Sequence, residues 1–183
     1  MLSTVSLIVA LGAAVSATEY GRISASPVKG TVFWMDVALD RETMVTSPGG
    51  PHPKPDCFLH TINFHDFQKK LVAIKSVDRG ACYIKVSKET YKEMEKILED
   101  FRAGNTKPIT QATEEWTVPE KAVDAEDVAQ AVGDKIANFC TGYNVILLAD
   151  APLNTSREGR ASKCEVACVS CSGSVFEATQ YSQ

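Results

Sequence analysis

The sequence is poor in the residues and motifs on which enzymes depend. It has three histidines, His52, His60 and His65, and no convergent set of further ligands that would complete a metal site with them. It also has no glycine-rich phosphate loop, no nucleophile elbow and no HExxH motif. We expect the histidines to be solvated or hydrogen-bonded and the neighbouring Glu114 and Glu115 to be a solvated pair. The sequence therefore predicts no enzyme, no cofactor and no metal.

A dominant charge and long apolar runs are missing as well. The net charge is -4, and Lys and Glu are interleaved along the chain, so the protein has no strong field of one sign. Beyond the N-terminal region, no segment is long and apolar enough for a bilayer span of about 20 residues. We expect no nucleic-acid partner and no membrane span.

The N-terminal region has the pattern of a signal peptide. Residues 1–17 contain no charged side chain, carry the apolar run Leu7–Leu11, and end in the small-residue pattern Val15-Ser16-Ala17. We expect cleavage after Ala17 and secretion, with a retained anchor as the alternative. A secreted chain enters an oxidising compartment in which disulfides persist.

The remaining chain is long enough for one domain with flexible extensions. Two segments are rich in turn residues and are expected to be loops, Ser47–Asp56 and Gly104–Thr113. The expected organisation is a signal peptide at 1–17, an N-terminal linker at 18–30, a domain at 31–150, a processing linker at 151–160 and a C-terminal peptide at 161–183.

Hydrophobic periodicity predicts an α+β domain, with an antiparallel sheet of about four to five strands and two helices packed on it. One helix is expected over Lys88–Ala103 with Ser87 as its N-cap. Asp124 is expected to cap a second helix, which holds Val128, Val132, Ile136 and Cys140. The expected strands are Thr31–Ala38, Phe58–Phe64, Leu71–Val77, Ala81–Val86, Glu115–Val118 and Tyr143–Leu148.

Two motifs then point to a family. The stretch HDFQKKLVAIKSVDRGACYIKV is followed by an amphipathic helix, a linker, and a second helix ending in NFCTGYN. Over about 31–148 the chain resembles a BRICHOS domain, whose markers are one aspartate and two cysteines, here Asp66, Cys82 and Cys140. After Cys140 many members continue with Gly and then Leu-Pro, whereas this chain reads Thr141-Gly142-Tyr143-Asn144.

The resemblance implies an antiparallel sheet with a helix on each side, a Cys82–Cys140 disulfide and a chaperone activity toward a β-prone segment of the same precursor. Such a disulfide would stabilise the fold by about 4 kcal/mol on the chain-entropy model. The alternative is two buried free thiols. Asp66 is by default a turn or capping residue, and the resemblance implies a partly buried, pH-sensitive carboxylate.

The segment after the domain has features of a processing site. Arg157 and Arg160 have the Arg-x-x-Arg spacing of a furin-type cleavage site, in a Ser- and Gly-containing stretch. Cleavage would release Ala161–Gln183; the alternative is that two arginines fall at this spacing by chance. Asn154 begins a glycosylation sequon, Asn-Thr-Ser, which fits an exposed secreted segment.

The C-terminal peptide holds the tail cysteines Cys164, Cys168 and Cys171 in a Val- and Phe-containing, β-prone stretch. Cys164 and Cys171 can oppose each other across a two-residue loop, and Cys57 is an alternative partner for a tail cysteine, so the pairing stays open. The C-x-x-x-C-x-x-C spacing also occurs in iron-sulfur sites, but a short secreted chain does not favour a cluster.

Two functions fit these observations. In the first, the domain is an intramolecular chaperone and the released peptide is a host-defence (antimicrobial) peptide, as in similar marine-worm precursors. The peptide has only Lys163 against Glu165 and Glu177, whereas membrane-active peptides are usually cationic. In the second, the chain stays uncleaved and acts like the gastrokines against aggregation. The expected partners are the chain's own peptide, a processing protease, membranes for the released peptide, and a second copy of the chain; a protease inhibitor or ligand-binding module has no supporting motif.

Overall fold

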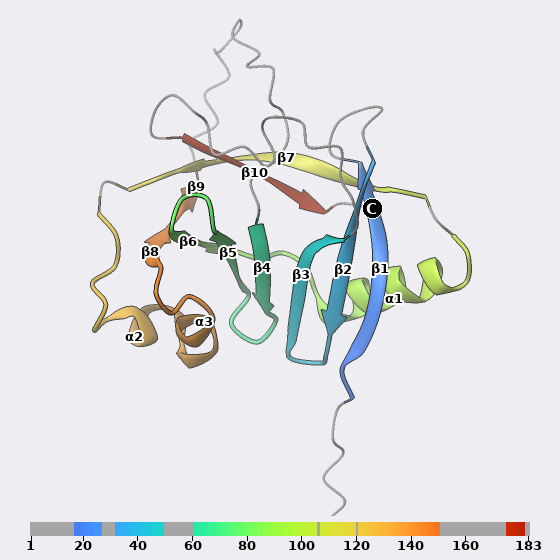
Figure 1. Cartoon of the computed structure of the whole chain (residues 1–183), viewed down its shortest axis with the longest axis horizontal. Helices are drawn as coiled ribbons and strands as arrows, with labels where there is room; N and C mark the ends of the chain where they lie inside the picture. The colour runs from blue at the N-terminus through green and yellow to red at the C-terminus, as the bar shows by residue number, and fades with distance from the viewer. Residues whose placement is uncertain are drawn as a thin grey trace, which may run out of the picture.

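The fold is a curved, twisted sheet with helices on both faces (Figure 1). It is taken from a computed structural model, which describes residues 17–26, 32–49, 61–105, 107–119, 121–150 and 175–181. None of the helices in these ranges is long and apolar enough to cross a membrane.

Seven strands form the main sheet, in the order β1-β2-β3-β4-β5-β6-β8. The first six are antiparallel neighbours, and β8 is parallel to β6. Their bounds are β1 Glu19–Ser26, β2 Phe33–Leu39, β3 Thr43–Gly49, β4 Thr61–Asp66, β5 Leu71–Ser76, β6 Ala81–Val86 and β8 Asn144–Leu147. The predicted α+β class is confirmed, but the predicted count of four to five strands is too low and the sheet is mixed.

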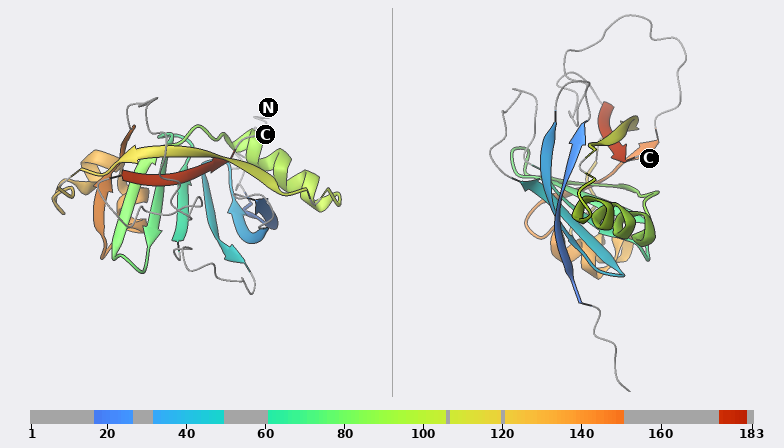
Figure 2. Two further views of the ribbon diagram at one scale, coloured as in Figure 1. Left: turned by 90° about the horizontal axis from the view of Figure 1, so that it is seen from above. Right: turned by 90° about the vertical axis from the view of Figure 1, so that its right-hand side faces the viewer.

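Three further strands lie across the main sheet. β7 (Ile109–Thr117) runs from one edge of the sheet to the other, and β10 (Val175–Tyr181) lies beside it (Figures 1 and 2). The first residues of β7 pair in parallel with the end of β1, and its last residues pair with β9 (Ala149–Asp150), which follows β8. β7 is therefore paired with the edge strand β1 at one end and, at the other, with β9, which follows the second edge strand β8.

Helix α1 (Tyr91–Arg102) follows the predicted amphipathic pattern, but it begins later than expected. Its N-cap is Thr90, because Thr90 and Glu93 form a capping box in which each side chain receives the other's backbone N–H. Ser87 instead donates its hydroxyl to Glu89. The apolar stripe of α1 packs on β1, β2 and β3 in a cluster formed by Ile23, Ala25, Met35, Val37, Leu39, Met44, Met94, Ile97 and Leu98.

The second predicted helix is two helices, α2 (Val128–Val132) and α3 (Asp134–Phe139). They are separated by Gly133, whose φ of 85° is incompatible with a continuous right-handed helix and is readily adopted only by glycine. The predicted cap is also wrong, because the N-cap of α2 is Asp127. The expected apolar face survives the break, since Val128, Val132, Ile136 and Cys140 are all buried in one cluster.

Register places the helices on opposite faces. Met44, which packs under α1, is the cross-strand partner of His65, and His65 is the partner of Val72, so these three side chains share one face. We call this the α1 face; β7 also covers it, through Trp116. The opposite face carries Phe64 and is covered by α2 and α3, so β4, β5 and β6 are enclosed on both sides.

Three segments differ from the sequence expectation. Glu19–Ser26, inside the predicted N-terminal linker, is β1; Thr43–Gly49 is β3, although Ser47, Pro48 and Gly49 indicated a loop. Ile109–Thr117 is a nine-residue strand, whereas only Glu115–Val118 was predicted to be extended and residues 104–113 were expected to be a loop. In each case the strand is specified by pairing with other strands, which local composition does not reveal.

Candidate functional site

The feature that links the domain to the C-terminal peptide is the pairing of β7 with β10. All seven residues of β10 have partners in β7, in antiparallel register from Val175 opposite Thr117 to Tyr181 opposite Gln111. The pairing is unbroken, so β10 is a complete added strand and not a local contact. Figure 2 shows the two strands side by side across the sheet.

Trp116 fastens β7 to the α1 face. Its side chain is 4 % exposed and lies in a cluster with Val72, Ile74, Ala81 and Tyr83 of β5 and β6. The ammonium Nζ of Lys85 lies 5.1 Å from the centroid of the indole ring, within the range of a cation–π interaction. A large buried aromatic side chain is worth several kcal/mol, so this anchor positions the end of β7 firmly.

A group of buried ionisable side chains lies on the same face. His65 of β4 and Glu89 of the β6–α1 connection have 4 % and 6 % of their side chains exposed, and His65 Nδ1 lies 3.8 Å from Glu89 Oε2. Lys85 of β6 is also buried, and its charge acts on both partners. We call His65, Lys85 and Glu89 the buried ionisable cluster.

Burial sets the protonation of this cluster. Desolvation lowers the pKa of His65 to about 4; the negative charge of Glu89 opposes this shift and the positive charge of Lys85 adds to it. Burial opposes ionisation of Glu89, but attraction to His65 and the hydrogen bond from Ser87 outweigh it, so the pKa of Glu89 is lowered. Near neutral pH His65 is therefore a neutral imidazole and Glu89 is a carboxylate.

The α1 face also holds buried polar atoms without hydrogen-bond partners. Within the described part of the chain they are Thr46 Oγ1, Asn63 Oδ1, Ser76 Oγ, Trp116 Nε1 and both ring nitrogens of His65. Register places the sheet residues of this set on one face, because Thr46 pairs with Asn63 and Asn63 pairs with Ile74. Unsatisfied buried polar groups cost free energy, so the packing beneath β7 is less favourable than that of an apolar core.

The disulfide implied by the resemblance is present. Cys82 of β6 and Cys140 after α3 are joined, with their Cα atoms 5.7 Å apart, and both are fully buried. The bond holds α3 against the sheet in the cluster of Ile84, Val128, Val132, Ile136 and Val145. The alternative of two free thiols is thereby excluded.

Asp66 has the turn role that its position suggested. Its Oδ1 accepts the backbone N–H groups of Gln68 at 3.0 Å and Lys69 at 2.9 Å, which fixes the turn between β4 and β5. The side chain is also buried, with Asp66 3 % exposed. Its role as a pH-sensitive carboxylate stays a prediction.

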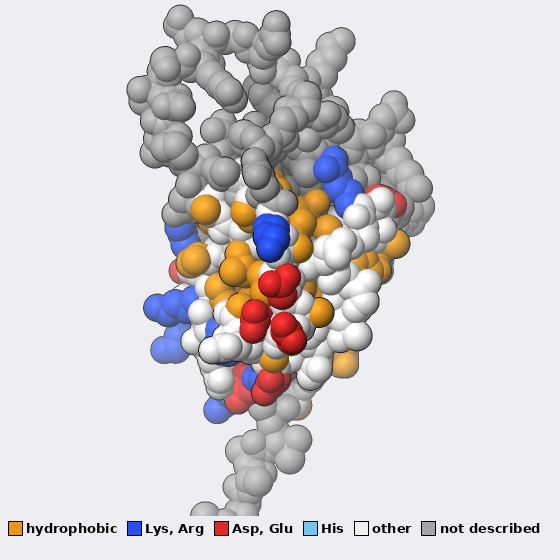
Figure 3. Space-filling view, turned by 90° about the vertical axis from the view of Figure 1, so that its left-hand side faces the viewer, with side chains coloured by type: hydrophobic (Ala, Val, Ile, Leu, Met, Phe, Trp, Pro, Cys, Tyr) orange, Lys and Arg blue, Asp and Glu red, His pale blue; other side chains and the backbone are white. Residues whose placement is uncertain are grey.

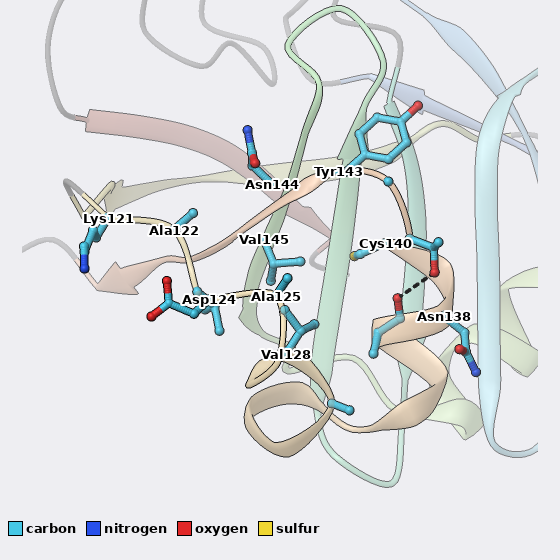
Figure 4. A pocket seen from close by; sticks show the side chains of 15 residues that line it. Lys121, Ala122, Asp124, Ala125, Val128, Asn138, Cys140, Tyr143, Asn144 and Val145 are labelled. Atoms are coloured by element: carbon cyan, nitrogen blue, oxygen red, sulfur yellow. Dashed lines mark hydrogen bonds between the residues drawn. The ribbon is translucent and has the colours of Figure 1, made fainter.

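A cavity of about 620 Å³ opens beside the disulfide (Figure 4). It lies between the segment before α2, the end of α3 and the start of β8, and its lining mixes apolar Val128 and Val145 with polar Asp124 and Asn138. On this side of the molecule acidic side chains are grouped over apolar surface (Figure 3). Lys121 and Asp124 are the charged residues of the lining, and the described residues hold no cluster of metal-ligating side chains.

Most of the predicted processing residues cannot be placed. Ala17 is exposed at the start of the described region. The others lie outside the described residues: Cys57, Asn154, Arg157, Arg160, Cys164, Cys168 and Cys171. Of Ala161–Gln183, the structure describes only β10.

The sequence reasoning missed the buried ionisable cluster. The expectation that His65 is solvated or hydrogen-bonded is wrong, since its ring is buried and neither nitrogen has a hydrogen-bond partner. One signal was available: Lys85 interrupts the apolar strand Ala81–Val86, which is enclosed on both faces. A lysine in such a strand indicates a buried charge that requires partners.

Comparison with known proteins gives one family match, which covers the central part of the chain. A family model for the BRICHOS domain matches residues 61–146, which run from the start of β4 into β8. No curated protein and no solved structure shows significant similarity to the chain. The family match includes the disulfide and Asp66, and it ends before the C-terminal peptide.

Proposed function

Because this chain contains a BRICHOS domain over residues 61–146, we propose that the domain is an intramolecular chaperone whose client is the C-terminal peptide of the same precursor. The observation that carries the proposal is the unbroken pairing of β10, which belongs to that peptide, with β7 of the domain. A chaperone for a β-prone segment has to occupy its backbone hydrogen-bonding groups, and strand pairing does so.

The client needs such protection because of its composition. The stretch before and within β10 combines Val, Phe, Thr and Tyr with few charges, which favours intermolecular strand pairing. In β10 the backbone groups on one edge are paired with β7. We propose that the domain keeps the peptide from aggregating during secretion.

The precursor layout is part of the proposal. A signal peptide at residues 1–17 would direct secretion, and a protease recognising Arg157 and Arg160 would free Ala161–Gln183. The freed peptide would act as a host-defence peptide through something other than strong positive charge, since it carries one lysine and two glutamates. The alternative is an uncleaved, gastrokine-like chaperone in which β10 stays in place permanently.

The test uses the secreted full-length protein. The chain is cut after Arg160, and aggregation of Ala161–Gln183 in this mixture is followed by thioflavin fluorescence beside the same peptide synthesised alone. We expect the peptide alone to aggregate and the mixture to show a lag at least several-fold longer. Equal lags would contradict a chaperone role for the domain. Intact mass with and without reduction shows beforehand whether cells make this cut and whether the fragment is disulfide-linked.

A further inference from the structure

The edge of β7 over Gln111–Thr117 that pairs with β10 is here called the β7 edge. We propose that the β7 edge is the docking site of the client, and that it keeps the peptide bound after the chain is cut at Arg160. This inference rests on the proposed chaperone function and adds the site, the mode of recognition and the step that releases the peptide. The occupant is the chain's own segment Val175–Tyr181.

The β7 edge is built independently of its occupant. The opposite edge of β7 is fixed at both ends, by pairing of Ile109 and Thr110 with β1 and of Trp116 and Thr117 with β9. Trp116 is in addition buried against the α1 face. The domain therefore offers a strand already held in extended form, so docking requires ordering of the client alone.

Recognition at this edge is through the main chain. Antiparallel pairing satisfies backbone N–H and C=O groups whatever the side chains are, so the site selects for an extended conformation more than for a sequence. A client of this site is therefore any segment of about seven residues that is free of proline. β10 has this length and contains no proline.

The ends of the intervening segment are held at one place on β7. Trp116 pairs with Asp150 on one edge and with Phe176 on the other, while Thr117 pairs with Ala149 and with Val175 in the same way. Asp150 and Val175 therefore lie on opposite edges of β7, two strand spacings apart, or about 10 Å. The paired residues on both sides stay in place if the chain is opened between them.

This arrangement determines what cleavage does. Arg160 lies fifteen positions before Val175, so a cut after it breaks no backbone pairing of β10. The cut changes an intramolecular contact with high effective concentration into a bimolecular one. The peptide is then released by dissociation from the β7 edge, as a second step after proteolysis.

Cysteine trapping in the full-length chain tests the docking site. In a background with Cys57, Cys164, Cys168 and Cys171 changed to serine and the Cys82–Cys140 disulfide kept, two in-register pairs are made, E115C/E177C and E114C/A178C. Adjacent pairs are used because one of them has the shorter, non-hydrogen-bonded spacing. The matched control, E115C/A178C, is shifted by one residue, which places the two side chains on opposite sides of the strands.

We expect one in-register pair to form its disulfide at least five-fold faster than the shifted pair, measured by mass after non-reducing digestion. Equal rates, or no bond in either in-register pair, would overturn the docking site. Native intact mass and circular dichroism of each variant confirm that the Cys82–Cys140 bond and the fold are kept, so that a negative result is informative.

Retention after cleavage is tested separately. After cutting at Arg160, Ala161–Gln183 should co-elute with the body in size-exclusion chromatography. E177P/A178P should abolish co-elution, because adjacent residues of β10 alternate in direction, so one of these two N–H groups faces β7 and proline removes it. S182P, one residue beyond β10, should leave it unchanged. Immediate release of the wild-type peptide would refute retention. If trapping fails while the domain still delays aggregation, the chaperone function is supported and the docking site is wrong. If trapping succeeds but aggregation is not delayed, the docking site is supported and the chaperone function is refuted.

Discussion

Lys85 lies over the ring of Trp116, with Nζ 5.1 Å from the ring centroid, and so joins the buried ionisable cluster of the main sheet to the strand that carries β10. Lys85 belongs to β6, in the middle of the domain, whereas Trp116 belongs to the crossing strand β7. The seating of β7 therefore depends on the packing and charge of the α1 face.

Removing the indole should destabilise the domain. We expect Trp116→Ala to lower the free energy of unfolding by about 3–5 kcal/mol, since it empties a buried site in the cluster of Val72, Ile74 and Tyr83. Chemical denaturation measures this loss. The matched control is Trp34→Ala, because Trp34 is 41 % exposed and its removal should cost about 1 kcal/mol or less. Similar losses in the two variants would show that Trp116 is not an anchor.

The buried histidine should make stability fall in mild acid. The pKa of His65 is about 4 in the folded protein and about 6.5 in the unfolded chain, so the unfolded state takes up a proton first as pH falls between these values. The contribution of neutral His65 is thus fully present above pH 6.5 and is lost progressively down to about pH 4. From pH 6.5 to pH 5 this group alone should lower the free energy of unfolding by about 1.5 kcal/mol.

His65→Gln isolates this effect, because glutamine does not titrate. Denaturation of the wild type and the variant at several pH values should show the two curves converging toward pH 5, with the loss in the wild type steeper by about the amount above. Parallel curves over this range would exclude His65 as its source. At lower pH a further loss is expected in the wild type, since the pKa of Glu89 is lowered and its carboxylate stabilises the fold only while ionised. This loss should be smaller in His65→Gln, because attraction to His65 is the largest cause that lowers the pKa of Glu89.

The disulfide should account for a large share of the stability. We expect C82A/C140A to unfold at lower denaturant concentration, with a loss of about 4 kcal/mol, because the bond closes a long loop between β6 and the end of α3. Reductant should destabilise the wild type by a comparable amount and leave the double variant unchanged. A wild type insensitive to reductant, with the thiols shown to be free, would contradict this account.

Asp66 offers a way to separate turn formation from charge. Asp66→Ala removes the acceptor for the N–H groups of Gln68 and Lys69 and should cost about 1–3 kcal/mol. Asp66→Asn keeps an acceptor oxygen and should cost less. The predicted role of Asp66 as a pH-sensitive carboxylate is checked by light scattering of the wild type and the Asn variant at several pH values. If oligomerisation depends on pH in the same way in both proteins, Asp66 does not have that role.

Local patterns were sufficient for the elements whose side chains repeat regularly. Ala81–Val86 was predicted at its observed bounds, and the stripe of Met94, Ile97 and Leu98 identified α1. β5 and β8 were found to within one residue at each end. In these segments, the residues that local structure requires are the same ones that the core buries.

Other elements depend on strand pairing that their own residues do not indicate. β3 ends in Ser47, Pro48 and Gly49, which favour a turn, yet these residues pair with β2. β7 follows Lys107 and Pro108 and is held by β1, β9 and β10, so its own residues carry little of the information. The docking site could not be predicted for the same reason.

The buried ionisable cluster shows a different limit. The sequence predicted His65 at the turn after the strand Phe58–Phe64 and Lys85 within the strand Ala81–Val86. Only the register of β4, β5 and β6 places the two side chains on one buried face. Cross-strand register depends on the turns at Asp66 and Gly80 and on the hydrophobic pattern together. The pKa of His65 follows from this packing and from no local motif.

Hydrogen exchange in the full-length protein shows whether the C-terminal peptide is held as a strand on β7. The alternate amides of Gln111–Thr117 and Val175–Tyr181 that face each other across the β7–β10 pair should be protected in the wild type and in S182P. In E177P/A178P these facing amides should exchange at least about ten-fold faster, while the paired amides of Ala81–Val86 stay protected. Unchanged exchange of these β7 amides in E177P/A178P would contradict the claim, because it would show that β10 does not occupy the β7 edge.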